Sequence, residues 1–170
     1  MSKSRIILGV DPGTTVLGYG IIRVEGNTLS MITAGVIKLQ KLDDHYEKLH
    51  RIYEKLDMLI KEYKPDEFAV ESPFFGKNVQ SMLKLGRAQG ITIVCAMNNG
   101  LKVFEYAPKK IKQSITGSGN ASKEQVAAMM STLLNSKEIP TILDATDALG
   151  AAVCHYFQKG IGTISLSGKK

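Results

Sequence analysis

An apolar run that ends on a single carboxylate is the feature that most constrains how this chain can fold. Residues 6–10, Ile-Ile-Leu-Gly-Val, are strand-forming and too few for a helix, so they predict a buried strand. Asp11 ends the run, and Pro12-Gly13 then forces a turn into a second strand over about 16–24. An ionised carboxylate beside a sheet core is costly unless a cation or hydrogen-bond donors compensate it.

Any cation that compensates the charge of Asp11 has to come from outside its own segment. The stretch 6–22 contains no Lys, Arg or His. Position alone leaves two interpretations open: Asp11 accepts N–H bonds from its own turn, as Asp commonly does before Gly, or it ligates a metal ion.

Length and composition indicate one ordinary globular domain with an anionic partner. The chain has 170 residues, of which 44% are hydrophobic, and its formal net charge of +6 favours nucleic acid as the first guess. Gly9 and Asp11 interrupt the N-terminal apolar run, so we expect neither a signal peptide nor a membrane span, and a cytoplasmic protein. Cys95 and Cys154 lie among apolar residues without zinc-like spacing, and we expect both in the core.

The remaining segments alternate between strand-like and helix-like patterns. They predict an α/β fold with a mixed five-stranded sheet, three antiparallel strands followed by two parallel ones, and helices on both faces. Ser122 and Gln125 form a capping box at the start of one helix. We expect a single domain over residues 1–158 and a basic, flexible tail over 159–170. The later elements are a strand at 29–38, a helix at 43–64, a strand at 67–70, a helix at 78–98, a strand at 102–106, a short helix from 108, and helices at 122–134 and 143–158.

Three further acids lie beside apolar residues, as Asp11 does. Glu71 ends the strand that begins at Glu67, and Asp144 and Asp147 are three residues apart, on one face of the last helix. The helical pair alone is explained at least as well by a favourable interaction with the helix dipole. It is improbable that four acids with no common role would all lie beside apolar residues, so the set of four indicates a common site.

Oxygen ligands without a nearby His or Cys select a hard cation, Mg²⁺ or Mn²⁺, over zinc. Two such ions about 4 Å apart can activate a water molecule and stabilise the leaving oxygen of a phosphoryl displacement. The four acids therefore predict a two-metal phosphodiester chemistry.

Five ordered motifs resemble those of the RuvC family of Holliday-junction resolvases, which belong to the ribonuclease H-like superfamily. The resemblance covers the chain from Ile6 to about Phe157. The motifs are Asp-Pro-Gly from residue 11 with the following Gly-Tyr-Gly, Glu71 at a strand end, Lys-Asn-Val-Gln-Ser-Met-Leu-Lys-Leu-Gly-Arg-Ala-Gln-Gly over 77–90, Tyr-Ala-Pro-Lys-Lys-Ile-Lys-Gln-Ser over 106–114, and Asp-Ala-Thr-Asp-Ala-Leu over 144–149.

The resemblance implies a ribonuclease H-like fold, a homodimer, and Mg²⁺-dependent nicking of two opposing strands of a four-way DNA junction in recombination and repair. It implies two Mg²⁺ ions per subunit, with Mn²⁺ as a substitute, and products with 5′-phosphate and 3′-hydroxyl ends. The catalytic and metal-binding residues carried over by position are Asp11, Glu71, Asp144 and Asp147. Docking of a branch-migration motor of the RuvA and RuvB type stays open.

The same resemblance assigns DNA contacts. Phe74 corresponds to an aromatic wedge that stacks on bases at the junction centre, and Phe75 beside it leaves open which of the two stacks. Lys112 and Lys123 match basic positions near the active site. Further basic residues are placed more weakly, since scattered surface lysines are usually solvated: Lys77, Lys84, Arg87, Lys109 and Lys110.

Two other functions are compatible with parts of the sequence. Asp-Pro-Gly-Thr-Thr from residue 11 is similar to the phosphate-binding turn of actin-like ATPases and phosphotransferases, but those enzymes need two such domains, and this chain has the length of one. A non-catalytic junction-binding module is the other alternative, and the four intact acids argue against it.

Overall fold

The computed structural model describes residues 4–73 and 76–159. None of the helices formed by these residues is long and apolar enough to cross a membrane. Phe74 and Phe75 lie outside the described residues, as do residues 160–170 of the predicted tail, while Lys159 ends the last helix. The elements are β1 (Arg5–Asp11), β2 (Val16–Glu25), β3 (Thr28–Lys38), α1 (His45–Tyr63), β4 (Glu67–Glu71), α2 (Val79–Asn98), β5 (Lys102–Tyr106), α3 (Pro108–Thr116), α4 (Lys123–Leu133) and α5 (Leu143–Lys159).

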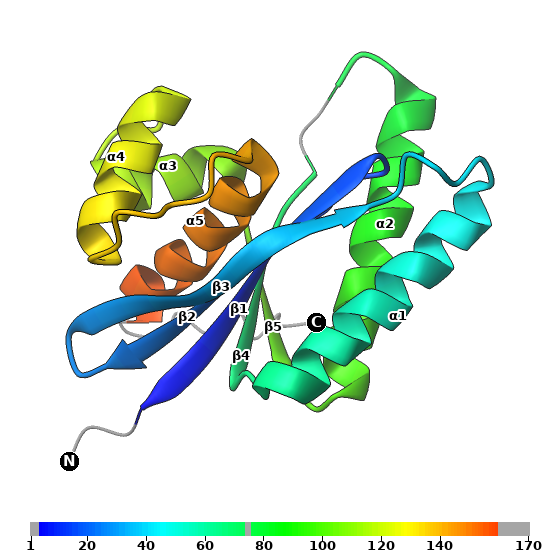
Figure 1. Cartoon of the computed structure of the whole chain (residues 1–170). Helices are drawn as coiled ribbons and strands as arrows, with labels where there is room; N and C mark the ends of the chain where they lie inside the picture. The colour runs from blue at the N-terminus through cyan, green and yellow to red at the C-terminus, as the bar shows by residue number, and fades with distance from the viewer. Residues whose placement is uncertain (1–3, 74–75, 160–170) are drawn as a thin grey trace, which may run out of the picture.

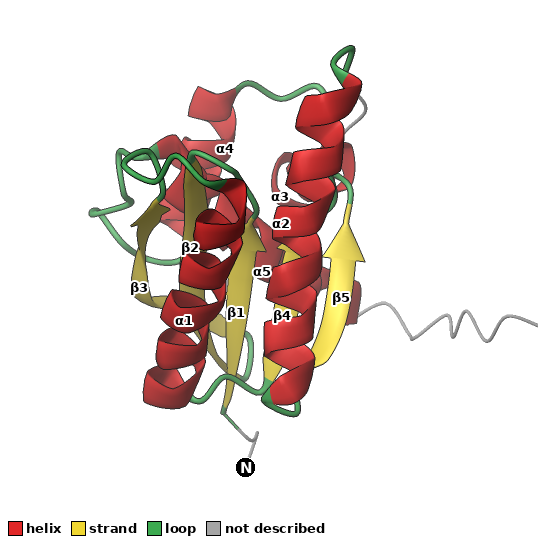
Figure 2. Cartoon of the chain, turned by 90° about the vertical axis from the view of Figure 1, so that its right-hand side faces the viewer, coloured by secondary structure: helices red, strands yellow, loops and turns green. Residues whose placement is uncertain are grey.

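The strands form one mixed sheet in the order β3-β2-β1-β4-β5 (Figure 2). β1, β2 and β3 pair antiparallel, whereas β4 and β5 run parallel to β1. The ribonuclease H-like sheet that the sequence predicts is therefore confirmed. Because Val10 pairs with Val70 in the parallel register, the next residues, Asp11 and Glu71, end neighbouring strands at the same edge of the sheet.

Helices cover both faces of the sheet, with α1 and α2 on one side and α3, α4 and α5 on the other (Figure 1). The alternation of side chains along β1 supplies both layers. Leu8 faces the core beneath α1 and α2, while Ile7 faces the core beneath α5. Cys95 is buried in the core beneath α1 and α2 and Cys154 in the core beneath α5, as predicted, and both are free thiols.

Local hydrogen bonds explain where two of the helices begin. The Asp44 side chain accepts a bond from the Glu47 amide and caps α1. The Ser122 side chain accepts from the Gln125 amide, and the Gln125 side chain accepts from the Ser122 amide, which confirms the predicted capping box of α4.

Three strand glycines allow α5 to lie directly against the backbone of the sheet. We call Gly9, Gly18 and Gly20 the glycine seat. A Cβ atom on Gly9 would lie 2.1 Å from the Ala148 carbonyl oxygen, and one on Gly18 would lie 1.9 Å from the Asp144 carbonyl oxygen. A Cβ atom on Gly20 would lie 2.7 Å from the Leu149 side chain and 2.8 Å from the Leu149 backbone nitrogen. No other residue type fits these positions, so the glycine seat fixes how close α5 comes to β1 and β2.

We expect Gly18→Ala to lower the free energy of unfolding by about 2–3 kcal/mol, because the added methyl group meets rigid backbone rather than a side chain that can turn away. Denaturant unfolding measures the loss. Gly76→Ala is the control, since the nearest atom to its Cβ is a Met82 side-chain atom at 3.9 Å, and its stability should stay within about 0.5 kcal/mol of the wild type. Equal stability of the two variants would contradict the tight contact at Gly18.

Candidate active site

The four predicted acids come from three elements that the sheet and the glycine seat bring to one place. Asp11 ends β1 and Glu71 ends β4, next to it in the sheet. Asp144 and Asp147 lie in the first two turns of α5, whose carbonyl at Asp144 packs on Gly18. Since Gly18 pairs with Asp11 across β1 and β2, the helix delivers its acids to the ends of the strands.

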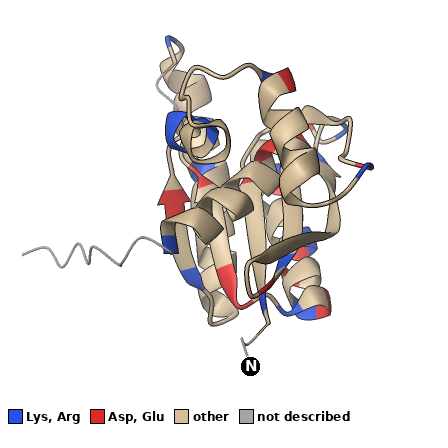
Figure 3. Cartoon of the chain, turned by 90° about the vertical axis from the view of Figure 1, so that its left-hand side faces the viewer, with Lys and Arg blue, Asp and Glu red and all other residues tan. Residues whose placement is uncertain are grey.

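A cavity of about 470 Å³ opens beside these acids. Glu71 and Asp147 line it together with Lys109, Lys112 and Lys123. Lys123 Nζ lies 3.8 Å from Asp147 Oδ2, the nearest approach of a cation to the four acids among the described ion pairs. Figure 3 views this side of the molecule and shows Lys and Arg segments interspersed with Asp and Glu segments. The cavity therefore combines carboxylates with cations that suit a phosphate group.

Burial and mutual repulsion make these carboxylates hard to ionise. Burial raises the pKa of Asp11 to about 6, with the charges of Asp147 and Asp144 adding to it, although the hydrogen bond with Glu71 opposes the rise. Burial raises the pKa of Glu71 to about 9, assisted by the charge of Asp11 and the hydrogen bond between the two groups. Asp11 and Glu71 thus share a proton near neutral pH.

The pKa of Asp147 is raised as well, first by burial and then by the charge of Asp144, while Lys123 and Lys112 counteract the rise. The lysines therefore compensate only part of the negative charge of the site. What the site still needs is additional positive charge.

A hard divalent cation fits this donor set. All four predicted ligands are carboxylates, and in the described part of the chain no three His, Cys, Asp or Glu side chains already lie close enough together to hold one ion. The chemistry of the donors, oxygen atoms with a surplus of negative charge, is what fits such an ion.

The other predicted DNA contacts divide between two regions. Lys109 lines the cavity, while Lys110, on the same helix, is exposed and is not among the lining residues. Lys84 and Arg87 lie on α2 near His45, where their charges help burial lower the pKa of that histidine. Lys77 is exposed just before α2. The structure therefore brings Lys109, Lys112 and Lys123 to the acids and leaves Lys77, Lys84 and Arg87 on the α2 side.

A buried ionic cluster at the other end of β4 was not predicted from the sequence. Glu67 begins β4 and is bonded by Arg5, His155 and Lys159. His155 Nε2 lies 2.7 Å from Glu67 Oε2, and His155 Nδ1 lies 2.6 Å from the Tyr106 hydroxyl oxygen. The feature of the sequence that could have indicated this cluster is Glu67, an acid at the start of an apolar strand that Glu71 ends.

The two acids of β4 differ in charge compensation. Burial alone would raise the pKa of Glu67, but the hydrogen bond from Lys159 and the neighbouring positive charges lower it. Burial lowers the pKa of His155, so its ring is neutral near pH 7 and donates from Nε2 to Glu67. Glu67 is therefore an ionised structural group, whereas Glu71 lacks comparable partners.

Comparison with known proteins decides which family this site belongs to. Residues 7–155 match the family model described as crossover junction endodeoxyribonuclease RuvC. The crossover junction endodeoxyribonuclease RuvC of Cytophaga hutchinsonii is 67% identical over 156 residues, which cover 92% of this chain and 78% of that protein. The chain belongs to the RuvC family.

Solved RuvC structures share the fold of this RuvC-family chain. The Thermus thermophilus RuvC structure has a TM-score of 0.84 and 34% sequence identity, covering 93% of this chain and 97% of that one. The structure of T. thermophilus RuvC in complex with Holliday junction substrate has the same TM-score, the same coverage of both chains and 31% identity. Family membership does not support the actin-like alternative, and it makes this chain an endodeoxyribonuclease.

Because the pKa values of Asp11 and Glu71 are raised, ionising these acids lowers the stability of the folded protein. The unfolded chain loses these protons near pH 4, whereas Asp11 and Glu71 keep theirs up to about pH 6 and pH 9 when folded. The stability of the metal-free protein should therefore be fully present below about pH 4 and should fall as pH rises through this window.

We expect Asp11→Asn to raise the free energy of unfolding of the metal-free protein at pH 8 by about 1–2 kcal/mol, because one repelling charge is removed from a partly exposed site. The same change should reduce the rise in melting temperature that Mg²⁺ produces. Thermal melts in EDTA and in Mg²⁺ measure both effects. The exposed Asp43→Asn is the control and should behave as wild type. Lower stability of Asp11→Asn at pH 8 would contradict the repulsion.

Proposed function

We propose that this chain resolves four-way DNA junctions by metal-dependent nicking of two opposing strands. The observation that carries the proposal is the meeting of Asp11 and Glu71 at adjacent strand ends with Asp147 and a lysine-lined cavity. Family membership supports a four-way junction as the substrate. The relatives are named crossover junction endodeoxyribonuclease, and T. thermophilus RuvC was solved in complex with Holliday junction substrate.

In this proposal Asp11, Glu71, Asp144 and Asp147 hold two Mg²⁺ ions, with Mn²⁺ as a substitute. When bound, the ions supply an activated water and charge stabilisation at the leaving oxygen, which gives 5′-phosphate and 3′-hydroxyl ends. The donor set supports hard cations, and the raised pKa values of Asp11 and Glu71 mark negative charge that a cation would compensate.

The lysines orient the DNA phosphate over the acids. Lys123 reaches Asp147, the charge of Lys112 acts on Glu71, and both lysines line the cavity together with these carboxylates. A phosphodiester that enters the cavity meets these ammonium groups, which offset its repulsion from the acids. Lys112 and Lys123 therefore serve both binding and chemistry.

A direct test compares a labelled four-way junction with a linear duplex made from its arms. In Mg²⁺ the wild type should nick the junction at symmetric positions and leave the duplex intact, and in EDTA it should bind without cutting. Asp147→Asn should bind the junction but cut about 100-fold or more slowly, because the amide lacks the charge that holds the cation. Asp43→Asn should cut at the wild-type rate. Cleavage of neither substrate by the wild type would overturn the proposal.

Salt dependence separates lysines that touch phosphate from those that do not. Lys112→Ala and Lys123→Ala should each reduce the slope of log affinity against log salt by about one unit, since each removes one phosphate contact. Lys102→Ala is the matched control because Lys102 pairs with Glu67 at the opposite end of the sheet. Fluorescence anisotropy of a labelled junction measures the slopes, and an unchanged slope for Lys112→Ala would place that lysine off the DNA.

We also propose that the active form is a two-fold dimer joined through α2. Val79, Leu83 and Met97 are each more than 60% exposed on one stripe of the helix. A Cβ on Gly86 or Gly90 would meet nothing within 4 Å, so these glycines are not needed for packing within the described chain. An exposed apolar stripe with small residues suits an isologous contact, and two sites match the symmetry of the junction.

Light scattering at micromolar concentration should give about twice the chain mass of 18.5 kDa. Leu83→Glu should yield a monomer, because a charge on the stripe opposes its burial against a second copy. Met129→Glu on α4 is the control, since Met129 is also exposed but lies outside α2. A wild-type monomer, or a dimer that survives Leu83→Glu, would contradict the proposed interface.

A further inference from the structure

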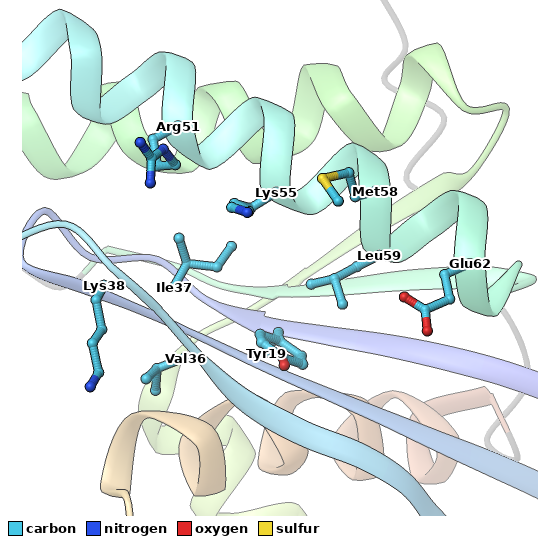
Figure 4. A pocket seen from close by; sticks show the side chains of 9 residues that line it. All are labelled: Tyr19, Val36, Ile37, Lys38, Arg51, Lys55, Met58, Leu59 and Glu62. Carbon is cyan, nitrogen blue, oxygen red and sulfur yellow. The ribbon is translucent and has the colours of Figure 1, made fainter.

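A second cavity, of about 400 Å³, lies between α1 and the strands β2 and β3, on the face of the sheet away from α5. Its middle is formed by Tyr19, Met58 and Leu59. Arg51, Lys55 and Lys38 line one part of it, and Glu62 lies further along α1 (Figure 4). The cavity thus has an apolar middle between a cationic end and an anionic end.

The three cations share this cavity without compensation from the protein. Arg51 and Lys55 are one turn apart on α1, and like charges at this spacing repel each other. Within residues 4–73 and 76–159, none of Lys38, Arg51 and Lys55 has a carboxylate oxygen within 4.0 Å. The cavity is therefore lined by three cations that have no carboxylate partner, and this favours an anionic occupant.

The cavity also includes the open edge of the sheet. β3 is the outermost strand, and in the described residues it pairs only with β2. In Figure 4 Ile37 lies on the side of β3 that faces α1, whereas Val36 and Lys38 lie on the other side. Because the cavity is lined by side chains from both sides, it wraps around the strand edge, where backbone N–H and C=O groups face outward.

We propose that the edge of β3 at Val36–Lys38, together with the cations of α1, docks an extended acidic segment of another protein. Such a segment adds a strand to β3 through backbone hydrogen bonds. Its alternate side chains place an apolar group against Met58 and Leu59 and a carboxylate against Arg51 and Lys55. The apolar side chains of the segment thus contact the middle of the cavity, and its carboxylates contact the cationic end.

Charge complementarity selects this occupant over two others. A second copy pairing edge to edge would bring two sets of the same cations together and would be repelled. The chain's own residues 160–170 contain two lysines and no acid, so they carry the wrong charge. DNA phosphates could contact the cations, but they leave the apolar middle unused and meet Glu62.

The test uses the full-length protein and a fluorescein-labelled peptide of alternating Glu and Val. Anisotropy should show binding in the micromolar range. Arg51→Gln/Lys55→Gln should weaken it by about tenfold or more, since two charges are removed. Arg23→Gln/Lys102→Gln, which neutralises two exposed cations of β2 and β5, is the matched control and should bind the peptide as wild type does. Thermal melts establish that both variants are folded, and junction cleavage by both should be unchanged.

A second peptide, methylated on alternate backbone nitrogens, separates strand addition from simple charge attraction. It keeps the same side chains but cannot form the backbone bonds, and it should bind about tenfold more weakly. No binding of the acidic peptide, equal binding to the Arg51→Gln/Lys55→Gln variant, or equal binding of the methylated peptide would overturn the proposal. Stronger competition by single-stranded oligo-dT than by the unlabelled peptide would assign the cavity to nucleic acid and overturn it as well.

Discussion

The contact between α5 and the glycine seat is the interaction on which the rest of the structure depends. Where side chains separate a helix from a sheet, its backbone lies well above the strands. Here the Asp144 carbonyl lies against Gly18, and the Ala148 carbonyl lies against Gly9. This close approach lowers the first turns of α5 to the level at which β1 and β4 end. Carboxylates from a helix and from two strands can then share one site, although about 70 residues separate Glu71 from Asp144 in the sequence.

The site itself is held in an electrostatically unfavourable state. Burial and like charge raise the pKa of Asp11, Glu71 and Asp147, and Lys112 and Lys123 compensate only in part. Two well-packed cores on either side of the sheet supply the stability that tolerates this cost. The buried cluster around Glu67 helps to anchor the C-terminal end of α5 through His155 and Lys159. The helix is thus fixed at one end by backbone packing and at the other by ionic hydrogen bonds.

The sequence allowed most of the fold to be predicted, because each element carries its own periodicity and its own end signals. Residues 6–10 and the Ser122 capping box are examples in which local physics decides the structure. A common site for Asp11 and Glu71 was predicted because each of these acids ends an apolar strand. Contacts between segments that are distant in the sequence were not predictable. The fit of Gly18 to α5, the partners of Glu67 and the wrapping of a cavity around β3 arise only once distant segments pack together.

β4 carries one glutamate at each end, and their surroundings shift the two pKa values in opposite directions: that of Glu67 is lowered and that of Glu71 is raised. Glu67 obtains its counter-charges from Lys159 and Arg5 within the chain, whereas Glu71 faces other acids. The charge of Glu67 is therefore compensated within the folded chain, without any ion from solution. One strand of five residues thus carries both a carboxylate that the chain compensates and a carboxylate that it leaves uncompensated.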